Sequence, residues 1–399
     1  MKHTSRALII GGGIAGPAAA LFLRRAGIES QIFEAYPEPS TIGGGFQIAP
    51  NGMRVMEALG LADRVRASGV LSSDFVFRNQ HGKVIGRIDV SSAGQGVTIR
   101  RSEFHRILMD AVTSAGIPIH YGKRLSSIEQ SGDAVTGQFE DGQVEKGDTL
   151  LAADGVHSRV RALLLTGNAS ARYTGFLGIG GFADPGLAAL NGPKDTRQLN
   201  FTVGSRFQIG YALMSESPIQ WGWWTHLPQG EELTRAELQA IADDTIRDRV
   251  LAAFGCWHAP IRSLVSNTKQ IMRTAIYDVP SLPSWHVGRV MLLGDAAHAM
   301  SPAGGQGASL ALEDAMVLGQ SLGSGSRSVT ETFAFVEAQL RARAERMVHQ
   351  AAQNDLRQVK ELGRFGQWMR DQAFSLIAPV IARELLRQYT ALQHLASAA

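Results

Sequence analysis

Three glycines and one acidic residue near the N-terminus have the types and the spacing that bind a dinucleotide. Gly11, Gly13 and Gly16 follow the G-x-G-x-x-G pattern. The first glycine permits a tight turn, the second lets a pyrophosphate approach the backbone, and the third lets a helix pack closely on a strand. Glu34 follows at close to the ~20 residues at which a carboxylate accepts from a ribose 2′-OH. An acid there disfavours a 2′-phosphate, so these residues predict bound FAD or NAD rather than NADP.

A strand, a helix and a second strand must position these residues. Residues 7–10 are a short apolar run that predicts a buried parallel strand, and residues 18–26 continue as a helix rich in alanine, leucine and arginine. A second strand over 30–33 leads to Glu34. The N-terminus of the helix would face the phosphates with unpaired N–H groups and the positive end of its dipole. This order of elements favours a nucleotide fold over the alternative of a glycine-rich turn without a ligand.

The composition is that of an ordinary globular protein. Hydrophobic residues make up 44% and charged residues 19% of the 399 residues, a length that allows two or three domains. The net charge of +3, without a run of lysine and arginine, argues against nucleic acid as a partner. No apolar run approaches the ~18 residues of a membrane span. We therefore expect no transmembrane segment, and we predict no metal site.

The chain has one cysteine, Cys256, so an intramolecular disulfide is impossible. This cysteine usage predicts a reducing compartment, which we take to be the cytoplasm. Because Cys256 is next to Trp257, we expect it to be a small core residue rather than a nucleophile.

Beyond the first motif, hydrophobic periodicity separates strands from helices. Residues 173–283 combine short alternating strands with many aromatic residues, and they predict a largely antiparallel sheet interrupted by one helix over 235–254. Other expected elements are a hairpin over 74–90, strands over 117–121, 125–129, 149–152 and 290–293, and helices over 53–59, 308–322 and most of 330–399.

The predicted fold class is α/β, with a Rossmann-like nucleotide-binding domain, an interleaved and mostly antiparallel sheet domain, and C-terminal helices. The nucleotide-binding domain is expected to be discontinuous, because the sheet domain occupies two separate parts of the sequence. The expected boundaries are 1–73, 96–172 and 284–328 for the first domain, 74–95 and 173–283 for the second, and 329–399 for the helical segment.

Two further glycine-bearing stretches follow predicted buried strands. Residues 154–161 read D-G-V-H-S-R-V-R, and residues 294–307 read G-D-A-A-H-A-M-S-P-A-G-G-Q-G. With the first glycine motif and Glu34, they resemble the three fingerprints of the class A FAD-dependent aromatic hydroxylases, flavoprotein monooxygenases typified by p-hydroxybenzoate and salicylate hydroxylases. The resemblance spans residues 5–350, without the thioredoxin-like domain of the larger members. It implies that the bound dinucleotide is FAD.

The resemblance also implies which residues contact FAD. Asp295 matches an aspartate that binds the ribityl chain. Arg101 matches an arginine that reaches FAD, with Arg100 as the competing register. Residues 302–307 open a helix whose first N–H groups can face the pyrimidine edge of the flavin. The predicted cofactor residues are Gly11, Gly13, Ile14, Ala15, Gly16, Glu34, Ala35, Gly45, Arg101, Leu125, Asp154, Asp295, Pro302, Gly305, Gln306, Gly307, Ala308 and Ser309.

Three features of these motifs have a second interpretation. The adjacent glycines at 43–45 could lie against a flat ligand or form a flexible loop. Asp154 and Arg161 could contact FAD and the nicotinamide, or they could hold the strand-to-helix turn. His298 has the chemistry of a base, but its place on a tight turn after Asp295 favours a structural role.

The chemistry implied by the resemblance is that of an external monooxygenase. NADH or NADPH reduces FAD, O₂ adds at flavin C4a to give a hydroperoxide, and the terminal oxygen passes to a nucleophilic carbon of an aromatic or polycyclic small molecule. The sequence does not distinguish NADH from NADPH, identifies no catalytic base, and is compatible with a monomer or a homodimer. The alternatives are a reductase, epoxidase, Baeyer–Villiger oxygenase or halogenase on the same fold, or a nucleotide-sensing protein without activity.

Aromatic and apolar residues of the sheet domain are the predicted lining of the substrate site, although half or more of them could instead be core residues beneath helices. Arg206 and Tyr211 could polarise a substrate oxygen. Near the C-terminus, an apolar stripe over 374–386 could meet a partner subunit or a membrane, but packing on the fold is favoured. The predicted substrate-lining residues are Phe201, Phe207, Tyr211, Met214, Trp221 and Trp223.

Overall fold

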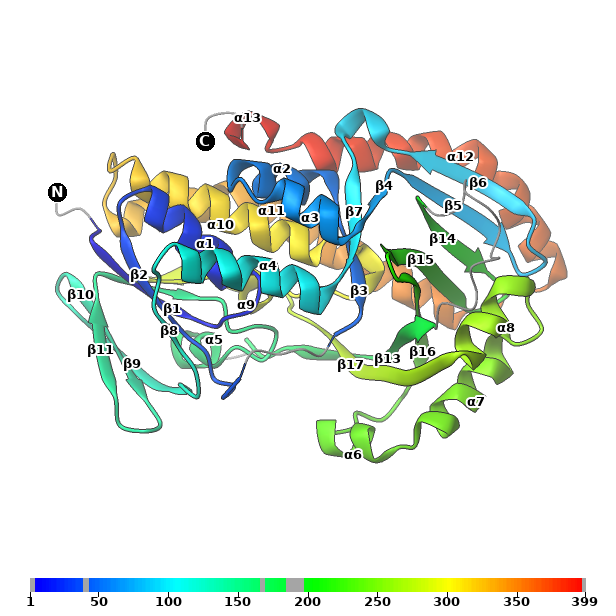
Figure 1. Ribbon diagram of the computed structural model, residues 1–399, viewed down its shortest axis with the longest axis horizontal. Coiled ribbons are helices and arrows are strands. Elements are labelled where there is room, and N and C mark those ends of the chain that lie inside the picture. The colour runs from blue at the N-terminus through cyan, green and yellow to red at the C-terminus, as the bar shows by residue number, and fades with distance from the viewer. Residues whose placement is uncertain (1–3, 39–42, 166–168, 184–196, 397–399) are drawn as a thin grey trace.

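The computed structural model describes residues 4–38, 43–165, 169–183 and 197–396 (Figure 1). Within these ranges the first layer is a six-stranded sheet, parallel except at the edge strand β18. Parallel strands end at the same edge of a sheet, so Gly11, Glu34 and Asp295, which follow three of them, lie along one edge. The strand order is β18 (His286–Val287), β19 (Val290–Leu292), β12 (Thr149–Ala152), β1 (Arg6–Ile10), β2 (Glu29–Phe33) and β8 (Ile119–His120).

Helices cover one face of this sheet and a β-meander covers the other. Helix α1 (Ala15–Arg25) packs against α10 (Gly307–Gly323) and α4 (Arg101–Ser114). On the opposite face, Gly137 and Gly147 bring the meander against Leu8. Because both faces are covered, residues 7–10 and 150–152 of the two central strands are apolar and buried, as expected for buried parallel strands. The meander consists of β9 (Leu125–Ser131), β10 (Ala134–Phe139) and β11 (Val144–Gly147).

A seven-stranded sheet forms the second layer. All neighbouring strands are antiparallel except β14 and β5, so the hairpin near residue 80 joins this sheet through a parallel pair. The strand order is β17 (Thr268–Asp278), β13 (Arg172–Ala183), β16 (Ile219–Pro228), β15 (Gln208–Glu216), β14 (Gln198–Val203), β5 (Asp74–Asn79) and β6 (Val84–Asp89).

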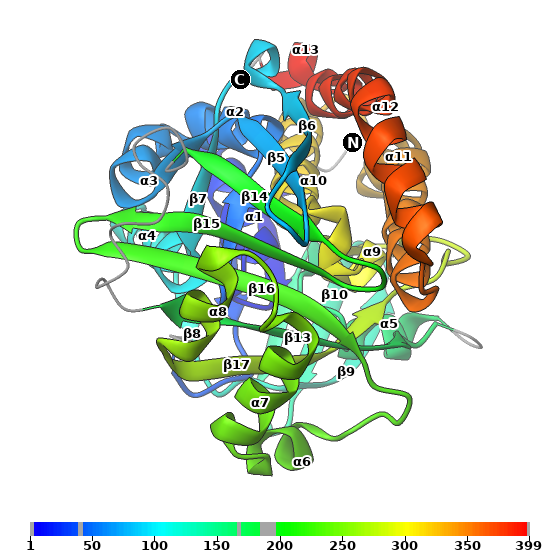
Figure 2. The same ribbon diagram turned by 90° about the vertical axis from the view of Figure 1, so that its right-hand side faces the viewer.

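The two faces of the seven-stranded sheet have different neighbours. Helices α6 (Arg235–Ala240), α7 (Asp243–Phe254) and α8 (Ala259–Ser266) cover one face (Figure 2). The other face turns toward the nucleotide fold, to which a small sheet connects it. That small sheet has the order β3 (Gly45–Ile48), β7 (Gly96–Arg100) and β4 (Val70–Ser72). The remaining short elements are α2 (Pro50–Ala58), α3 (Ala62–Ser68), η1 (Ser91–Ala93), α5 (Arg159–Leu164), α9 (Asp295–His298) and η3 (Pro302–Gly304).

The structure corrects two expectations in the helical insert. The single helix expected over 235–254 is two helices, because the backbone is extended at Ile241 and Ala242. Asp243 then begins the second helix, where its carboxylate accepts from the backbone N–H of Ile271 and pairs with Arg273. Cys256 is exposed in the turn that follows, and it is not a core residue.

The C-terminal region is helical, as expected, but it is divided. Helix α11 (Val329–Val359) begins at a capping box formed by Ser328 and Glu331 and packs against α10. Helix α12 (Arg364–Thr390) lies against β6, and a short α13 (Gln393–Ala396) follows. No helix in the described ranges has the length and apolar character needed to cross a membrane.

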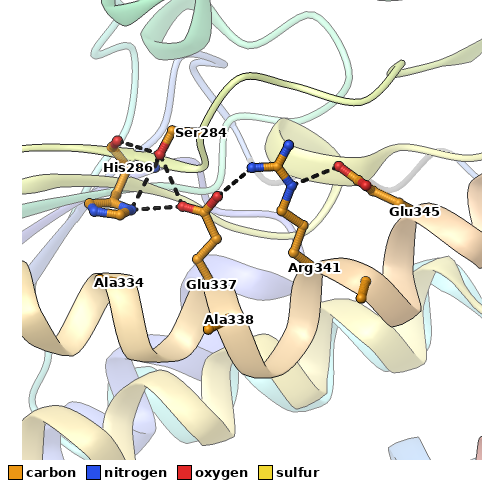
Figure 3. Close-up of a pocket in the computed structure, with 8 residues that line it drawn as sticks. Ser284, His286, Ala334, Glu337, Ala338, Arg341 and Glu345 are labelled. Atoms are coloured by element: carbon orange, nitrogen blue, oxygen red, sulfur yellow. Dashed lines mark hydrogen bonds and ion pairs between the residues drawn. The ribbon is translucent and has the colours of Figure 1, made fainter.

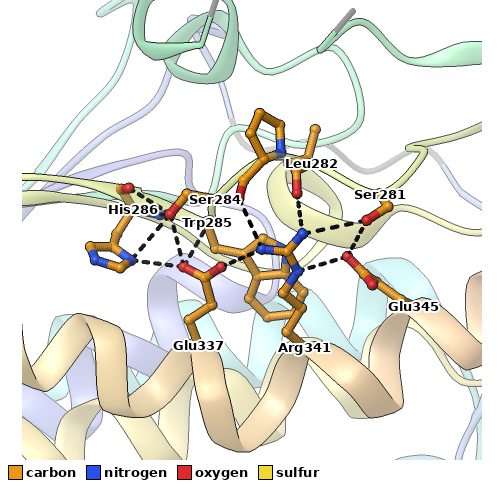
Figure 4. Close-up of polar contacts among 9 residues, drawn as sticks. Ser281, Leu282, Ser284, Trp285, His286, Glu337, Arg341 and Glu345 are labelled. Carbon is orange, nitrogen blue, oxygen red and sulfur yellow. Dashed lines mark hydrogen bonds and ion pairs between the residues drawn. The ribbon is translucent and has the colours of Figure 1, made fainter.

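A polar cluster fixes α11 to the segment that enters β19 (Figure 4). The Glu337 carboxylate accepts from the Trp285 N–H at 2.9 Å and the Ser284 hydroxyl at 3.0 Å, and it pairs with His286 at 2.7 Å. Arg341 donates to Glu337 at 2.7 Å. The groove of about 430 Å³ above this cluster is lined by these mutually bonded groups (Figure 3), so we assign it a structural role.

Candidate active site

The first glycine turn combines two tight contacts with one open position. A Cβ on Gly11, whose φ is +107°, would lie 2.3 Å from the carbonyl oxygen of Ala153, and a Cβ on Gly16 would lie 2.0 Å from the carbonyl oxygen of Gly11. Neither position tolerates a side chain. Gly13 has no heavy atom within 4 Å of its Cβ position. The turn is therefore tightly packed where it faces the protein, at Gly11 and Gly16, and open at Gly13, where a pyrophosphate would approach.

Glu34 is bonded to this turn directly. Its Oε2 accepts from the Gly12 N–H at 2.7 Å, and its Oε1 accepts from the Tyr36 N–H at 2.9 Å. His105 of α4 holds the other side of the turn, since its Nε2 lies 2.7 Å from the Gly12 carbonyl oxygen. A carboxylate has about four acceptor positions, so Glu34 keeps capacity for a ribose hydroxyl.

The glycines before β3 are held between two side chains. A Cβ on Gly43 would lie 2.9 Å from Cδ of Arg101, and a Cβ on Gly45 would lie 2.5 Å from Sδ of Met214. Arg101 also donates its backbone N–H to the Gly44 carbonyl at 2.9 Å. Arg100 instead lies over the Phe182 ring, 4.6 Å from its centroid. The side chain of Arg101 therefore lies against the glycine segment, whereas Arg100 pairs with Gly45 through its backbone only.

The third motif places an acid beside a helix N-terminus. Asp295 is exposed, and its side chain forms no ion pair or hydrogen bond with the described residues. Its Oδ1 atom is 3.9 Å from the Cβ position of Gly307. Gly307 begins α10, whose first N–H groups lack partners within the helix. Gln306 precedes it, and its buried Oε1 has no hydrogen-bond partner among the described residues. An accessible carboxylate, free N–H groups and an unpaired acceptor are suited to a polar ligand.

Contacts between the motifs bring them to one edge of the parallel sheet. Gly11 packs on Ala153, which joins the first motif to the second. The Cβ position of Gly294 lies 3.2 Å from Cβ of Ala15, which joins the first motif to the third. The Ser309 hydroxyl accepts from the Ala49 N–H at 3.2 Å and so ties α10 to the glycine segment. The open position at Gly13, the accessible Asp295 and the unpaired Gln306 fit FAD.

The second motif favours its structural interpretation. Asp154 accepts from the Ser158 hydroxyl at 2.6 Å and the Val160 N–H at 3.0 Å, so it holds the start of α5. Burial raises the pKa of Asp154, and these hydrogen bonds oppose that effect. Arg161 donates to the carbonyl oxygens of Val156, Ala169 and Ala296 and is 2% exposed. These groups hold three chain segments together.

Other predicted cofactor residues remain predictions. Leu125 is buried and packs against Gly137 of the meander. Ile14, Ala35 and Ala308 are half-buried around the glycine turn, the end of β2 and the start of α10. Pro302 lies in the η3 turn, and Gly305, with φ of +63°, has no heavy atom within 4 Å of its Cβ position.

His298 is part of the scaffold behind Asp295. Its Nε2 lies 2.7 Å from Oδ2 of Asp314, which also accepts from the Gly294 N–H. Burial lowers the pKa of His298, but the Asp314 carboxylate outweighs it, so that the pKa lies above the ordinary value. The pair therefore fixes the turn that presents Asp295.

This pair predicts a pH-dependent contribution to stability. Because the pKa of His298 is higher in the folded state, its stabilising effect is complete below the unfolded pKa and is lost as pH rises through the folded pKa. Replacing His298 by Gln should therefore cost more unfolding free energy at pH 6 than at pH 9, as measured by urea unfolding. An equal cost at both pH values would contradict the assignment.

The structure corrects most of the predicted substrate lining. Tyr211, Trp221 and Trp223 are buried between the sheet and helices α6 to α8, and Phe207 packs there against Phe254. They are core residues of the covered face. The two predicted residues on the opposite face are Phe201 and Met214.

The predicted catalytic candidates are also misplaced. Arg206 is exposed in the β14–β15 turn and lies over the Phe207 ring, 5.2 Å from its centroid. Tyr211 faces the helices. Neither side chain belongs to the face on which Met214 contacts the glycine segment.

Sequence reasoning missed two residues of that face and the helical partner of one of them. Trp224 lies across Gly210 and makes an edge contact with Phe201, with ring centroids 5.9 Å apart. His226, two residues further along β16, pairs with Asp355 of α11 at 3.2 Å. His226 and Asp355 are almost completely buried, and Oδ2 of Asp355 has no hydrogen-bond partner among the described residues. Strand alternation would have placed Trp224 and His226 on the same face of the sheet as Met214, but it could not have indicated Asp355 as the partner of His226.

Comparison with known proteins agrees with this geometry. The family described as FAD binding domain matches residues 4–351. A 6-hydroxynicotinate 3-monooxygenase of Bordetella bronchiseptica is 31% identical over 335 residues, which cover 80% of this chain and 82% of the relative. The aurachin C monooxygenase/isomerase of Stigmatella aurantiaca is 33% identical and covers 81% and 82%. The structure of Klebsiella pneumoniae HpxO complexed with FAD and uric acid has a TM-score of 0.83 at 26% identity, with 96% of each chain covered.

The fold and the glycine turns are those of an FAD-binding flavoprotein. The chain belongs to the FAD binding domain family and, within it, to the class A FAD-dependent aromatic hydroxylases. It is an FAD-dependent monooxygenase, as the sequence motifs predict.

Proposed function

We propose that this monooxygenase uses NADH or NADPH and O₂ to hydroxylate an aromatic or heteroaromatic small molecule. The observation that carries the proposal is the contact of Met214 with Gly45, which sets an aromatic-rich sheet face against the glycine segment of the cofactor site. The relatives support a ring substrate, because they include monooxygenases of 6-hydroxynicotinate and a hydroxylase of urate. The single exposed cysteine is consistent with a reducing, cytoplasmic location.

The motifs described above would hold the cofactor. The turn at Gly13 and the N-terminus of α1 bind the pyrophosphate, Glu34 binds the adenosine ribose, and Asp295 binds the ribityl chain. The N-terminus of α10 lies beside Asp295 and favours negative charge on the bound group. Bound FAD supplies the activation of O₂, with one oxygen atom delivered to the substrate and the other released as water.

The sheet supplies the substrate wall. Met214, which is 1% exposed, fills the contact of the sheet with Gly45 and lies against Gly222, and Trp224 lies across Gly210 on the same face. Phe201 continues it. An apolar aromatic wall orients a planar ring by stacking and excludes water from the reacting atoms. We propose that the cofactor domain and the sheet domain have the boundaries expected from the sequence. The substrate site then lies between the six-stranded and the seven-stranded sheet.

We further propose that His226 and Asp355 are the polar end of this wall. Ala351, one turn before Asp355 on α11, lies 3.2 Å from the Cβ position of Gly304 in the η3 turn. The pair therefore lies between the sheet face and the loop that precedes α10. A buried carboxylate oxygen without a partner is costly, and an N–H or O–H of the substrate would satisfy it.

This role predicts a selective kinetic effect. Asp355→Asn should raise KM about tenfold for a hydroxylated or N-heterocyclic ring, because one charge-assisted hydrogen bond is lost. KM for a ring without an N–H or O–H should change little, and the flavin content should match that of the wild type. Steady-state NADH and NADPH oxidation measures both. Equal effects on the two kinds of ring would contradict a substrate contact.

The function itself is tested with the purified, flavin-loaded chain. Hydroxynicotinates, urate, phenols and aromatic acids are screened for faster NADH or NADPH oxidation with stoichiometric O₂ uptake, and peroxide is measured to exclude uncoupled turnover. At least one ring should give a hydroxylated product. A chain that retains FAD but never couples oxidation to product across such a panel would refute the proposed substrate class.

A further inference from the structure

Helix α12 carries an uncovered apolar stripe along its outer side. The inner side of the helix is packed: Phe374 lies in contact with Gly86 and its ring is 4.6 Å from that of Phe77, and Ile381 and Leu385 join the same cluster. The expected packing of this segment on the fold is thus correct for the inner side only. The outer side chains keep large exposed fractions: Phe365 74%, Trp368 56%, Met369 49%, Leu376 78%, Ile377 47% and Val380 69%.

The stripe has the spacing of a helix-packing seam. Phe365, Met369, Leu376 and Val380 are separated by four, seven and four residues, which places them on one side of the helix over ~22 Å, with exposed Gln372 between Met369 and Leu376. The rings of Phe365 and Trp368 stack with centroids 6.0 Å apart. The two rings therefore form one apolar surface at this end of the stripe.

The size of the stripe is that of a protein interface. Its six side chains expose on the order of 700 Å², close to the roughly 800 Å² that each partner contributes to a standard interface. Monomeric proteins rarely expose a contiguous apolar patch of this size without a use for it.

The charges at the ends of the stripe favour a second copy over a lipid surface. Exposed Lys360, Glu361 and Arg364 flank its N-terminal end, and exposed Arg383, Glu384 and Arg387 flank its C-terminal end. An anionic membrane selects a uniformly basic border, which is not present here. Each end carries two basic residues and one acidic residue, so an antiparallel pair of identical helices can place the acid of each end beside a base of the other.

We propose that the chain forms a homodimer in which the α12 helices of two copies pack antiparallel through this stripe. A two-fold axis near the middle of the stripe makes the contact self-complementary, as a closed dimer requires. Met369 and Leu376 then lie nearest the axis, Phe365 of one copy approaches Val380 of the other, and the mixed charges form the rim. The inference does not depend on the proposed substrate.

Sedimentation velocity of the flavin-loaded full chain at about 1–100 μM tests the proposal. We expect a particle of twice the 42.9 kDa chain mass. The double variant Leu376→Asp/Val380→Asp should be monomeric and still yellow, because both side chains point away from the core. Val144→Asp, a 57% exposed apolar position on β11, is the matched control and should remain dimeric.

Three results would overturn the proposal. A wild-type chain that is monomeric at the highest concentration has no such interface. A dimer that survives the double variant uses another surface. A wild-type chain that sediments with vesicles of phosphatidylglycerol and phosphatidylcholine, while the double variant does not, would assign the stripe to a membrane surface.

Discussion

Gly13→Val should give a folded but colourless protein. The Cβ position of Gly13 has no heavy atom within 4 Å and its backbone is outside the left-handed region, so the apoprotein accepts the side chain without strain. The added isopropyl group occupies the space through which a pyrophosphate approaches the backbone. We expect flavin occupancy to fall at least tenfold, with a thermal unfolding midpoint equal to that of the wild-type apoprotein.

Two matched variants make this result specific. Gly230→Val adds the same side chain at another open glycine, away from the motifs, and should leave the protein yellow. Gly16→Val places a Cβ 2.0 Å from a carbonyl oxygen and should fail to fold stably. Absorbance at the flavin band per mole of protein measures occupancy. Wild-type occupancy in Gly13→Val would show that the first turn does not hold the cofactor.

Arg343→Met should produce the largest loss of stability among the charged positions discussed here. Its guanidinium donates to Oε2 of Glu313 at 2.7 Å and to the Gln388 carbonyl oxygen at 2.8 Å, and so joins α10, α11 and α12. Glu313 is 2% exposed, and its other partner is the Asn51 amide at 3.0 Å. Removing the arginine leaves a buried carboxylate without its counter-charge, which costs about 3–5 kcal/mol.

The destabilisation caused by Arg343→Met should increase with pH. Burial raises the pKa of Glu313, and Arg343 opposes that effect. An acid whose pKa is raised by folding contributes fully to the unfolding free energy below its unfolded pKa. That contribution is lost as pH rises through its folded pKa. Without Arg343 the burial effect is unopposed, so the loss of unfolding free energy should be larger at pH 8 than at pH 5.

Urea unfolding of four proteins measures these effects. Arg346→Met changes an exposed arginine on the same helix and should remain within about 0.5 kcal/mol of the wild type. Adding Glu313→Gln to Arg343→Met should recover part of the loss, because the unpaired charge is gone. A loss below about 1 kcal/mol in Arg343→Met would mean that Glu313 is not held as a buried charge.

The sequence was sufficient for the cofactor motifs because their requirements are local. Spacing alone indicates the positions at which any side chain would collide with a carbonyl oxygen, so that glycine is required. It also indicates the acid that ends the next strand. The contact of Gly11 with Ala153 and that of Gly294 with Ala15 then follow from the parallel order of the strands.

The proposed substrate wall required information that the sequence lacks. Alternation shows that neighbouring residues of β15 and β16 face opposite sides, but not which side is covered by helices. Tyr211, Trp221 and Trp223 lie on the helix-covered side, whereas Met214 lies on the opposite side, and its place in the substrate site stays a prediction. One contact, Met214 with Gly45, settles the orientation of the sheet, and it joins residues far apart in the chain.

Long-range pairs were beyond the sequence for the same reason. His226 and Asp355 are 129 residues apart, and each is unremarkable in its own segment. Their pairing depends on where α11 crosses the second sheet. The break at Ala242 likewise depends on Asp243 reaching Arg273 and Ile271 in β17, a tertiary contact that outweighs the helical propensity of the segment.

The glycine beneath Trp224 has a consequence for how this scaffold can change. Because Gly210 has no side chain, the indole alone fills the space down to the main chain of β15. A smaller residue at position 224 would leave that space open without moving a strand. If Trp224 lines the substrate site as proposed, the range of ring sizes admitted can drift by single codon changes while the oxygen chemistry stays intact.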